Sequence, residues 1–169
     1  YTASASQAAV YNSSVAYNNI FPFTNVRYSQ QNDGRKLDVV LQNSQCLNNL
    51  PASAKYIVLK EKIQIPSGWT LSSSDRGYNL YAGSTWIANF PKPVANETES
   101  PAKNYTEESP SKEGIQQIVQ NGTELTFYTK FDVNWLKNST RNFPVTLDPV
   151  VSYYPTNISM ASGNMTGPA

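Results

Sequence analysis

Residues 55–65 read KYIVLKEKIQI, a stretch in which apolar side chains alternate with polar ones. The apolar side chains of one parity are Ile57, Leu59, Ile63 and Ile65. Lys60 and Lys62 belong to the opposite parity. Because successive side chains of a β-strand point to opposite faces, this period of two predicts a strand with one face in the core and the other in solvent.

The rest of the chain repeats this pattern in short segments separated by turn residues. Further strands are predicted at residues 24–30, 36–42, 69–72, 78–90, 115–120 and 124–134. The segments between them contain Gly, Pro and Asn, as at Asn121-Gly122, and these residue types favour tight turns. Many short strands joined in this way predict an all-β fold, an Ig-like antiparallel β-sandwich.

Two segments depart from the pattern. Residues 91–113 are rich in Pro and Glu and lose the apolar alternation, so they are predicted to form a long exposed loop. Residues 142–151 have the pattern of a strand but contain Pro144 and Pro149. Because proline cannot donate a ladder hydrogen bond, this last strand is predicted to lie at an edge or terminal position of a sheet.

The composition excludes several classes of function. The chain has 169 residues, a length that fits one domain, with two very small domains as the alternative. Charged residues make up 15% and the net charge is +1, so the sequence predicts no binding of nucleic acid or of an anionic membrane. No apolar stretch approaches about 18 residues, so no transmembrane segment is predicted.

Residues suited to catalysis are scarce. The chain contains no histidine, the commonest general base and metal ligand. It has no nucleophile elbow, phosphate loop or Asp-rich calcium loop, and no pair of carboxylates stands out. The sequence therefore predicts a protein that is not an enzyme and holds no metal or cofactor. Tyr78, Tyr81 and Trp86 are interpreted as core or cross-strand residues, with a sugar-binding face as the alternative.

Seven acceptor sequences of the form Asn-x-Ser/Thr predict a secreted protein that carries covalent N-glycans. They begin at Asn12, Asn96, Asn104, Asn121, Asn138, Asn157 and Asn164. Most lie in segments predicted to be exposed: the Pro/Glu-rich loop, the Asn121-Gly122 turn and a polar C-terminal tail. The chain starts without a charged and apolar leader pattern, so a signal peptide is expected to have been removed already. The single cysteine, Cys46, can form no intrachain disulfide and is interpreted as a buried small apolar residue.

The N-terminal segment, residues 3–17, reads ASASQAAVYNSSVAY. Its odd positions carry mostly small or apolar side chains, and neither Gly nor Pro occurs before Pro22. This predicts a single extended strand, much longer than the usual strand of about 5–6 residues. Residues 1–20 are therefore predicted to form an extended arm that needs a partner groove, and residues 21–169 to form the β-sandwich domain.

An extended arm in front of a β-domain that is rich in sequons, poor in cysteine and free of histidine resembles the subunits of the archaeal thread filaments of Sulfolobus and its relatives. The resemblance implies a pilin-like β-sandwich in an extracellular, cell-surface filament that serves adhesion or biofilm formation. Identical subunits would join head-to-tail by donor-strand complementation, in which the arm of one subunit fills a groove of the next.

In such an arm the odd-numbered side chains would enter the groove, and Asn12 would face solvent. These groove-facing residues are Ala3, Ala5, Ala9, Tyr11, Val15 and Tyr17. The glycans would coat the filament and could mediate its contacts with other cells or surfaces. The alternative is a monomeric secreted β-sandwich, either a surface module or a carbohydrate-binding module, in which residues 3–17 are only the first strand or a linker.

Overall fold

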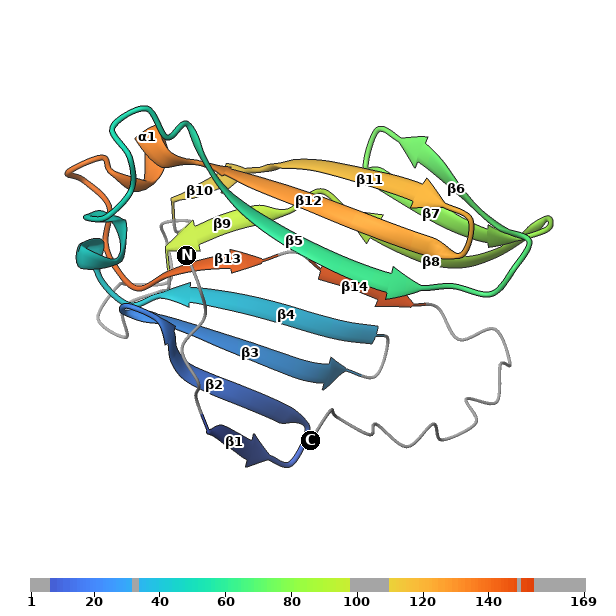
Figure 1. Ribbon diagram of the computed structural model, residues 1–169, viewed down its shortest axis with the longest axis horizontal. Coiled ribbons are helices and arrows are strands. Elements are labelled where there is room, and N and C mark those ends of the chain that lie inside the picture. The colour runs from blue at the N-terminus through green and yellow to red at the C-terminus, as the bar shows by residue number, and fades with distance from the viewer. Residues whose placement is uncertain (1–6, 32–33, 98–109, 149, 154–169) are drawn as a thin grey trace.

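The computed structural model describes residues 7–31, 34–97, 110–148 and 150–153, which form two antiparallel β-sheets (Figure 1). The strands before residue 92 are β1 (Ala8–Tyr11), β2 (Ser14–Phe21), β3 (Thr24–Gln31), β4 (Gly34–Leu41), β5 (Tyr56–Gln64), β6 (Trp69–Ser74), β7 (Gly77–Ala82) and β8 (Thr85–Pro91). The later strands are β9 (Val94–Glu97), β10 (Ser111–Glu113), β11 (Ile115–Asn121), β12 (Glu124–Asp132), β13 (Val145–Asp148) and β14 (Val150–Tyr153). Two short helices, the 3₁₀ helix η1 (Ser44–Leu47) and α1 (Val133–Leu136), connect strands at one end of the molecule.

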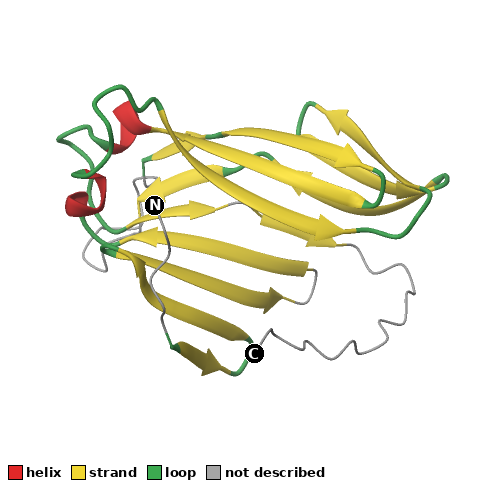
Figure 2. Ribbon diagram, in the orientation of Figure 1, coloured by secondary structure: helices red, strands yellow, loops and turns green. Residues whose placement is uncertain are grey.

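The larger sheet follows the order β1-β2-β3-β4-β14-β8-β7-β6, and β13, β9 and β10 branch from β4. The smaller sheet has the order β11-β12-β5. Strands dominate the described chain and the two sheets are arranged like a sandwich, so the prediction of an all-β antiparallel fold is confirmed (Figure 2).

Residues 55–65 behave as their alternation predicts. In β5 the exposure of the side chains alternates along the whole strand, with Ile57, Leu59 and Ile63 on the less exposed face and Lys60 and Lys62 on the other. β12 pairs with β5 in an unbroken antiparallel register. The small sheet therefore presents one apolar face to the large sheet.

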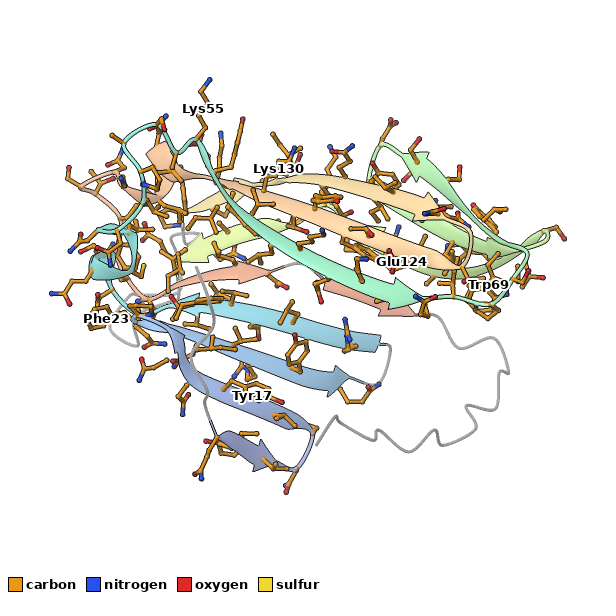
Figure 3. All side chains as sticks on the ribbon, in the orientation of Figure 1. Tyr17, Phe23, Lys55, Trp69, Glu124 and Lys130 are labelled. Carbon is orange, nitrogen blue, oxygen red and sulfur yellow. The ribbon has the colours of Figure 1, made fainter. Side chains whose placement is uncertain are left out.

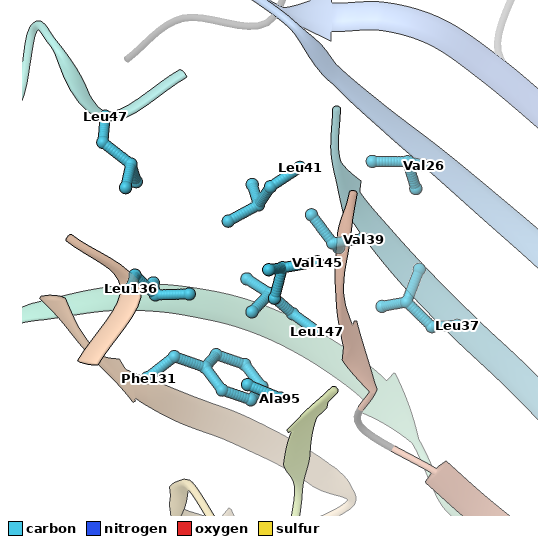
Figure 4. Close-up of a cluster of buried hydrophobic side chains, with 10 residues drawn as sticks. All are labelled: Val26, Leu37, Val39, Leu41, Leu47, Ala95, Phe131, Leu136, Val145 and Leu147. Atoms are coloured by element: carbon cyan, nitrogen blue, oxygen red, sulfur yellow. The ribbon is translucent and has the colours of Figure 1, made fainter. Parts of the chain in front are cut away.

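Apolar side chains between the two sheets form two buried clusters. The first consists of Val26, Leu37, Val39, Leu41, Leu47, Ala95, Phe131, Leu136, Val145 and Leu147 (Figure 4). The second consists of Ile65, Leu80, Ile87, Ala88, Phe90, Ile118, Leu125 and Phe127. In the second cluster the rings of Phe90 and Phe127, one from each sheet, meet edge to face with their centroids 5.0 Å apart.

The segment with two prolines lies inside the large sheet, so its predicted edge position is wrong. It forms two strands: β13 pairs with both β4 and β9, and β14 pairs with both β4 and β8. Pro144 precedes β13, and Pro149 falls in the sequence between β13 and β14. Because Pro144 lies before the first residue of β13, it removes no ladder hydrogen bond, and the interior position of β13 is compatible with it. Pro149 lies outside the described residues.

Two further predicted elements need correction. Residues 78–90 form two strands rather than one, because the chain turns back between β7 and β8 at Gly83, whose φ of +60° suits glycine. The predicted loop at residues 91–113 contains β9 and β10, which pair with each other. Only residues 98–109 of this segment lie outside the described part of the chain.

Candidate functional site

The N-terminal segment forms a hairpin instead of one long strand. β1 pairs antiparallel with β2, with Val10 opposite Val15, and Asn12-Ser13 connects the two strands. The prediction of a continuous strand is therefore wrong over residues 7–17. Asn and Ser are turn-forming residues, and the run Asn12-Ser13-Ser14 is the local signal for this reversal. The reversal gives backbone groups of β1 a partner within the chain, which an isolated arm would lack.

The hairpin separates the residues predicted to face one groove. Residues directly opposite each other in a hairpin share a face, and here odd positions stand opposite even ones. Ala9 and Tyr11 consequently lie on one face, whereas Val15 and Tyr17 lie on the other together with Val10. The first two predicted residues, at positions 3 and 5, lie outside the described chain. Whether any of the six enters a groove of another copy stays a prediction.

The face of Val10, Val15 and Tyr17 continues the apolar core face of the large sheet. Tyr17 stands opposite Val26 of the first core cluster, and its ring meets that of Tyr28 edge to face at 6.5 Å. None of these three hairpin residues belongs to either core cluster, and Val10 is 77% exposed. We call this surface, formed by Val10, Val15 and Tyr17, the open face. It lies at the end of the large sheet that the small sheet leaves uncovered, where Tyr17 is labelled in Figure 3.

A cluster of three side chains marks the border between the packed core and the open face. The guanidinium of Arg35 lies 5.6 Å from the ring centre of Tyr28 and forms an ion pair at 3.3 Å with Glu61 of β5. Burial raises the pKa of the Glu61 carboxyl, while Arg35 acts in the opposite direction. Burial also raises the pKa of Tyr28, and the nearby carboxylate of Glu61 adds to this effect. This cluster links the two sheets beside the hairpin.

β1 is the end strand of the large sheet in the described part of the chain. An end strand carries backbone N–H and C=O groups on its outer side that are available to another strand. Proteins usually protect such an edge with charged residues or proline, but β1 has the sequence AAVY and contains neither. Val10 and Tyr11 are 77% and 59% exposed. This edge is therefore suited to pairing with a strand of another chain.

The opposite face of the hairpin borders a shallow groove of about 490 Å³. Tyr11, Ser14 and Ala16 line it from the hairpin, and Asn25 and Arg27 line it from β3. An aromatic ring beside amide and guanidinium donors offers a stacking surface and hydrogen bonds of the kind that a sugar ring and its hydroxyl groups can use.

Three of the four described sequons lie in exposed turns, as predicted for Asn121. Asn12 belongs to the turn between β1 and β2, Asn121 ends β11 at its hairpin turn, and Asn138 follows α1. All three are exposed. Asn104, Asn157 and Asn164 lie outside the described residues.

Asn96 is the fourth described sequon, and its predicted place in an exposed loop is wrong. It lies in β9, opposite Ser111 of β10 on one side and Thr146 of β13 on the other, and is only partly exposed. The surrounding Pro and Glu residues are typical of a loop, and the apolar alternation of residues 94–97 is too short to predict a strand. This segment becomes a strand because it pairs with β10 and β13. Asn96 is therefore the least accessible of the four.

Cys46 lies in η1 and packs against the first core cluster as a partly buried side chain. Burial raises the pKa of this thiol to about 11. The interpretation of Cys46 as a small apolar residue agrees with this position, except that the side chain is not fully buried.

The raised pKa predicts a slow reaction of Cys46 with alkylating agents, because the thiolate is the reactive form. At pH 8 we expect iodoacetamide to modify the folded protein at least about tenfold more slowly than the urea-unfolded chain, whose thiol has a pKa near 8.5. The folded-state pKa lies above the unfolded one, so this group should also reduce stability as the pH rises from about 8.5 toward 11. Mass spectrometry of timed samples measures the rate, and equal rates for the two forms would contradict the predicted burial effect.

No group of three or more His, Cys, Asp or Glu side chains in residues 7–31, 34–97, 110–148 and 150–153 is placed to hold a metal ion. The same part of the chain contains no helix long and apolar enough to cross a membrane.

Comparison with protein-family models, curated proteins and solved structures found no match to this chain. The open face, the β1 edge and the exposed sequons are therefore the features from which a function can be inferred.

Proposed function

We propose that the chain is the structural subunit of an extracellular, glycosylated filament in which identical copies join head-to-tail by exchanging β1. The observation that carries this proposal is the position of β1: an uncharged end strand whose only partner strand among the described elements is β2. Such a strand can leave its own sheet without disturbing either core cluster, since none of its residues belongs to them.

The exchange replaces contacts within one chain by the same contacts between two chains. In the closed chain Ala8 stands opposite Tyr17 and Val10 opposite Val15. If the Asn12-Ser13 turn opens, β1 can take this place on β2 of the next copy, so the pairing itself requires no new complementarity. The opened segment is then one extended strand, which is the form that the alternation of residues 3–17 predicts. A head-to-tail contact of this kind does not close on itself and propagates into a fibre.

The open face supplies a driving force for assembly. Val10, Val15 and Tyr17 leave apolar surface in water in the single chain, and each Å² of such surface removed from water contributes about 25 cal/mol. A neighbouring copy held by the exchanged strand would lie next to this surface. Strand exchange without such burial would provide no net stabilisation, because the pairing of β1 with β2 is the same in the closed chain and in the fibre.

The sequons fit a filament that is exposed to solvent. Glycans on Asn121 and Asn138 would be attached at exposed turns of the sandwich, and one on Asn12 would be attached at the turn where the exchange occurs. Such a coat would keep the fibre soluble and could attach it to other cells or surfaces, in keeping with a role in adhesion or biofilm formation.

Electron microscopy and size-exclusion chromatography of the full chain and of a variant lacking residues 1–11 test this function. We expect fibres from the full chain and only monomers from the variant, because β1 is then missing. The deletion stops at residue 11 because β2 pairs with β3 from Ser14 onward and belongs to the sheet. Circular dichroism of the shortened chain checks that it still folds, and fibres from a folded shortened chain would rule out the proposal.

A reversible lock on the hairpin provides the matched control. The variant Ala9→Cys/Ala16→Cys, with Cys46→Ser to remove the native thiol, places two cysteines directly opposite each other, within the Cα separation that a disulfide spans, and leaves the three residues of the open face unchanged. The oxidised protein should remain monomeric because β1 cannot leave β2, and the reduced protein should form fibres. Fibres from the oxidised protein would show that copies associate without exchange.

The groove beside Tyr11 supports a second candidate, a monomeric carbohydrate-binding module. This function predicts that the full chain stays monomeric and binds a soluble oligosaccharide, and that Tyr11→Ala abolishes binding. Calorimetric titration with a panel of oligosaccharides distinguishes the two candidates, since a filament subunit requires no such affinity.

A further inference from the structure

A cavity of about 550 Å³ lies at the helical end of the molecule, between η1 and the turn that follows α1. Ser44, Leu47 and Asn48 line it from the first segment, and Phe143 lines it from the approach to β13. Asn138, the acceptor residue of a sequon, lines the same cavity. A predicted modification site thus lies beside this cavity. The cavity is large enough for a ligand, since ligand sites in proteins commonly measure about 300–1,000 Å³.

The sequon at Asn138 is held in a fixed turn. Its Oδ1 accepts hydrogen bonds from the backbone N–H of Thr140 at 2.9 Å and from the Thr140 hydroxyl at 2.8 Å. The side-chain oxygen of Asn138 is therefore engaged within the turn itself, and the residue is exposed. The amide nitrogen, to which a glycan would be linked, takes no part in these hydrogen bonds.

Arg141 connects this turn to the body of the protein. Its Nη2 donates to the hydroxyl oxygen of Thr140 at 3.1 Å, and its guanidinium stacks over Trp135 with 4.6 Å to the ring centre. Its Nη1 lies 2.9 Å from the buried carboxylate of Glu97. A glycan on Asn138 would consequently start from a rigid anchor beside the cavity rather than from a mobile loop.

We propose that this cavity is the binding seat of the oligosaccharide carried by Asn138, so that its first sugars pack against the protein. The inference rests on the glycosylation that the proposed function includes, but not on filament assembly. The partly exposed ring of Phe143 offers apolar surface for the C–H faces of sugar rings, and the exposed Ser44, Asn48 and Lys137 offer hydrogen-bonding groups for their hydroxyls. Because the glycan is covalently tethered, weak contacts suffice to keep it bound.

Asn121 provides a matched comparison. It is an exposed sequon in a hairpin turn on the small sheet and lines neither of the two cavities described above. A glycan there would project into solvent and contribute little to the stability of the fold. A glycan on Asn138 would link η1 to the turn after α1 and stabilise both.

The test compares the full chain with Asn138→Gln and Asn121→Gln, each made in a host that attaches N-glycans and in one that does not. The same proteins made without glycans show how much Tm changes when the Asn138 side chain and its turn are lost. The difference in Tm between the two hosts therefore measures the contribution of the glycan alone. We expect the glycan on Asn138 to raise Tm by roughly 3 °C, against less than about 1 °C for that on Asn121. Hydrogen exchange should show slower exchange at residues 44–50 only when Asn138 carries its glycan.

Peptide mapping by mass spectrometry reports which asparagines are occupied. An unoccupied Asn138, or an occupied one with no greater effect on Tm and on exchange than Asn121, would overturn the proposal. A second variant, Ser44→Trp, fills the cavity and should abolish the glycan-dependent rise in Tm while leaving occupancy intact. Electron microscopy of the same proteins measures fibre formation separately. The proposal that the glycan binds in the cavity and the proposal that the chain forms filaments are therefore tested independently.

Discussion

Replacement of Arg141 by methionine is expected to lower the free energy of unfolding by roughly 3–5 kcal/mol, because it leaves a buried carboxylate without its cation. The side chain of Glu97 is only 3% exposed and that of Arg141 13%. Arg141 Nη1 approaches Glu97 Oε1 to 2.9 Å in an ion-pair contact, and Asn142 Nδ2 donates to Glu97 Oε2 at 3.1 Å. Among the described residues, the Glu97 carboxylate then keeps the hydrogen bond from the Asn142 amide as its one polar side-chain contact.

The double variant Glu97→Gln/Arg141→Met separates the buried charge from the other contacts of Arg141. It should recover much of the lost stability, because no uncompensated charge remains. Lys62→Met serves as the surface control, since Lys62 pairs with Glu124 at 2.8 Å on the exposed face of the small sheet. That change should leave the denaturation midpoint almost unchanged. Urea unfolding gives the denaturation midpoint of all three variants. A midpoint for Arg141→Met close to that of Lys62→Met would contradict the assignment of Glu97 and Arg141 as a buried ion pair.

Phe131→Ala is expected to destabilise the protein by roughly 3–5 kcal/mol through the cavity that it creates. Phe131 is only 1% exposed and belongs to the central strand of the small sheet. Its ring lies in the first core cluster together with Leu147 and Ala95 of the large sheet (Figure 4). Loss of this ring removes contacts between the two sheets that the surrounding side chains can replace only in part.

Two variants calibrate this result. Phe131→Leu keeps an apolar side chain at the site and should cost less than Phe131→Ala. Val119→Ala alters the same sheet on its exposed face, where Val119 is partly in water, and should cost under about 1 kcal/mol. Chemical denaturation should give the same m-value for each if unfolding remains two-state. A small loss for Phe131→Ala would mean that the two sheets are not held together at this point.

The strand pattern was largely predictable because alternation is a local property. Residues 55–65 indicate the exposed and the inward faces of β5 without reference to any partner, and Asn121-Gly122 indicates the hairpin of β11 and β12. The prediction for residues 3–17 is wrong because alternation alone cannot distinguish a long strand from two strands that fold back on each other. After a two-residue turn, odd-numbered side chains point to the opposite face of the sheet from the odd-numbered side chains before it. Asn12-Ser13 is too weak a turn signal to predict this reversal without knowledge of which strands pair.

The candidate sites depend on contacts between distant parts of the chain. Glu97 was expected in an exposed loop, yet it is buried against Arg141, and the cavity beside Asn138 is completed by η1. By itself the sequence determined the β class, most strand positions, the exposed faces and the sequons, because periodicity and turn chemistry act over a few residues. Only the tertiary structure decided the order of the strands, the uncovered end of the large sheet and the pairing of buried charges, because these depend on which distant segments meet.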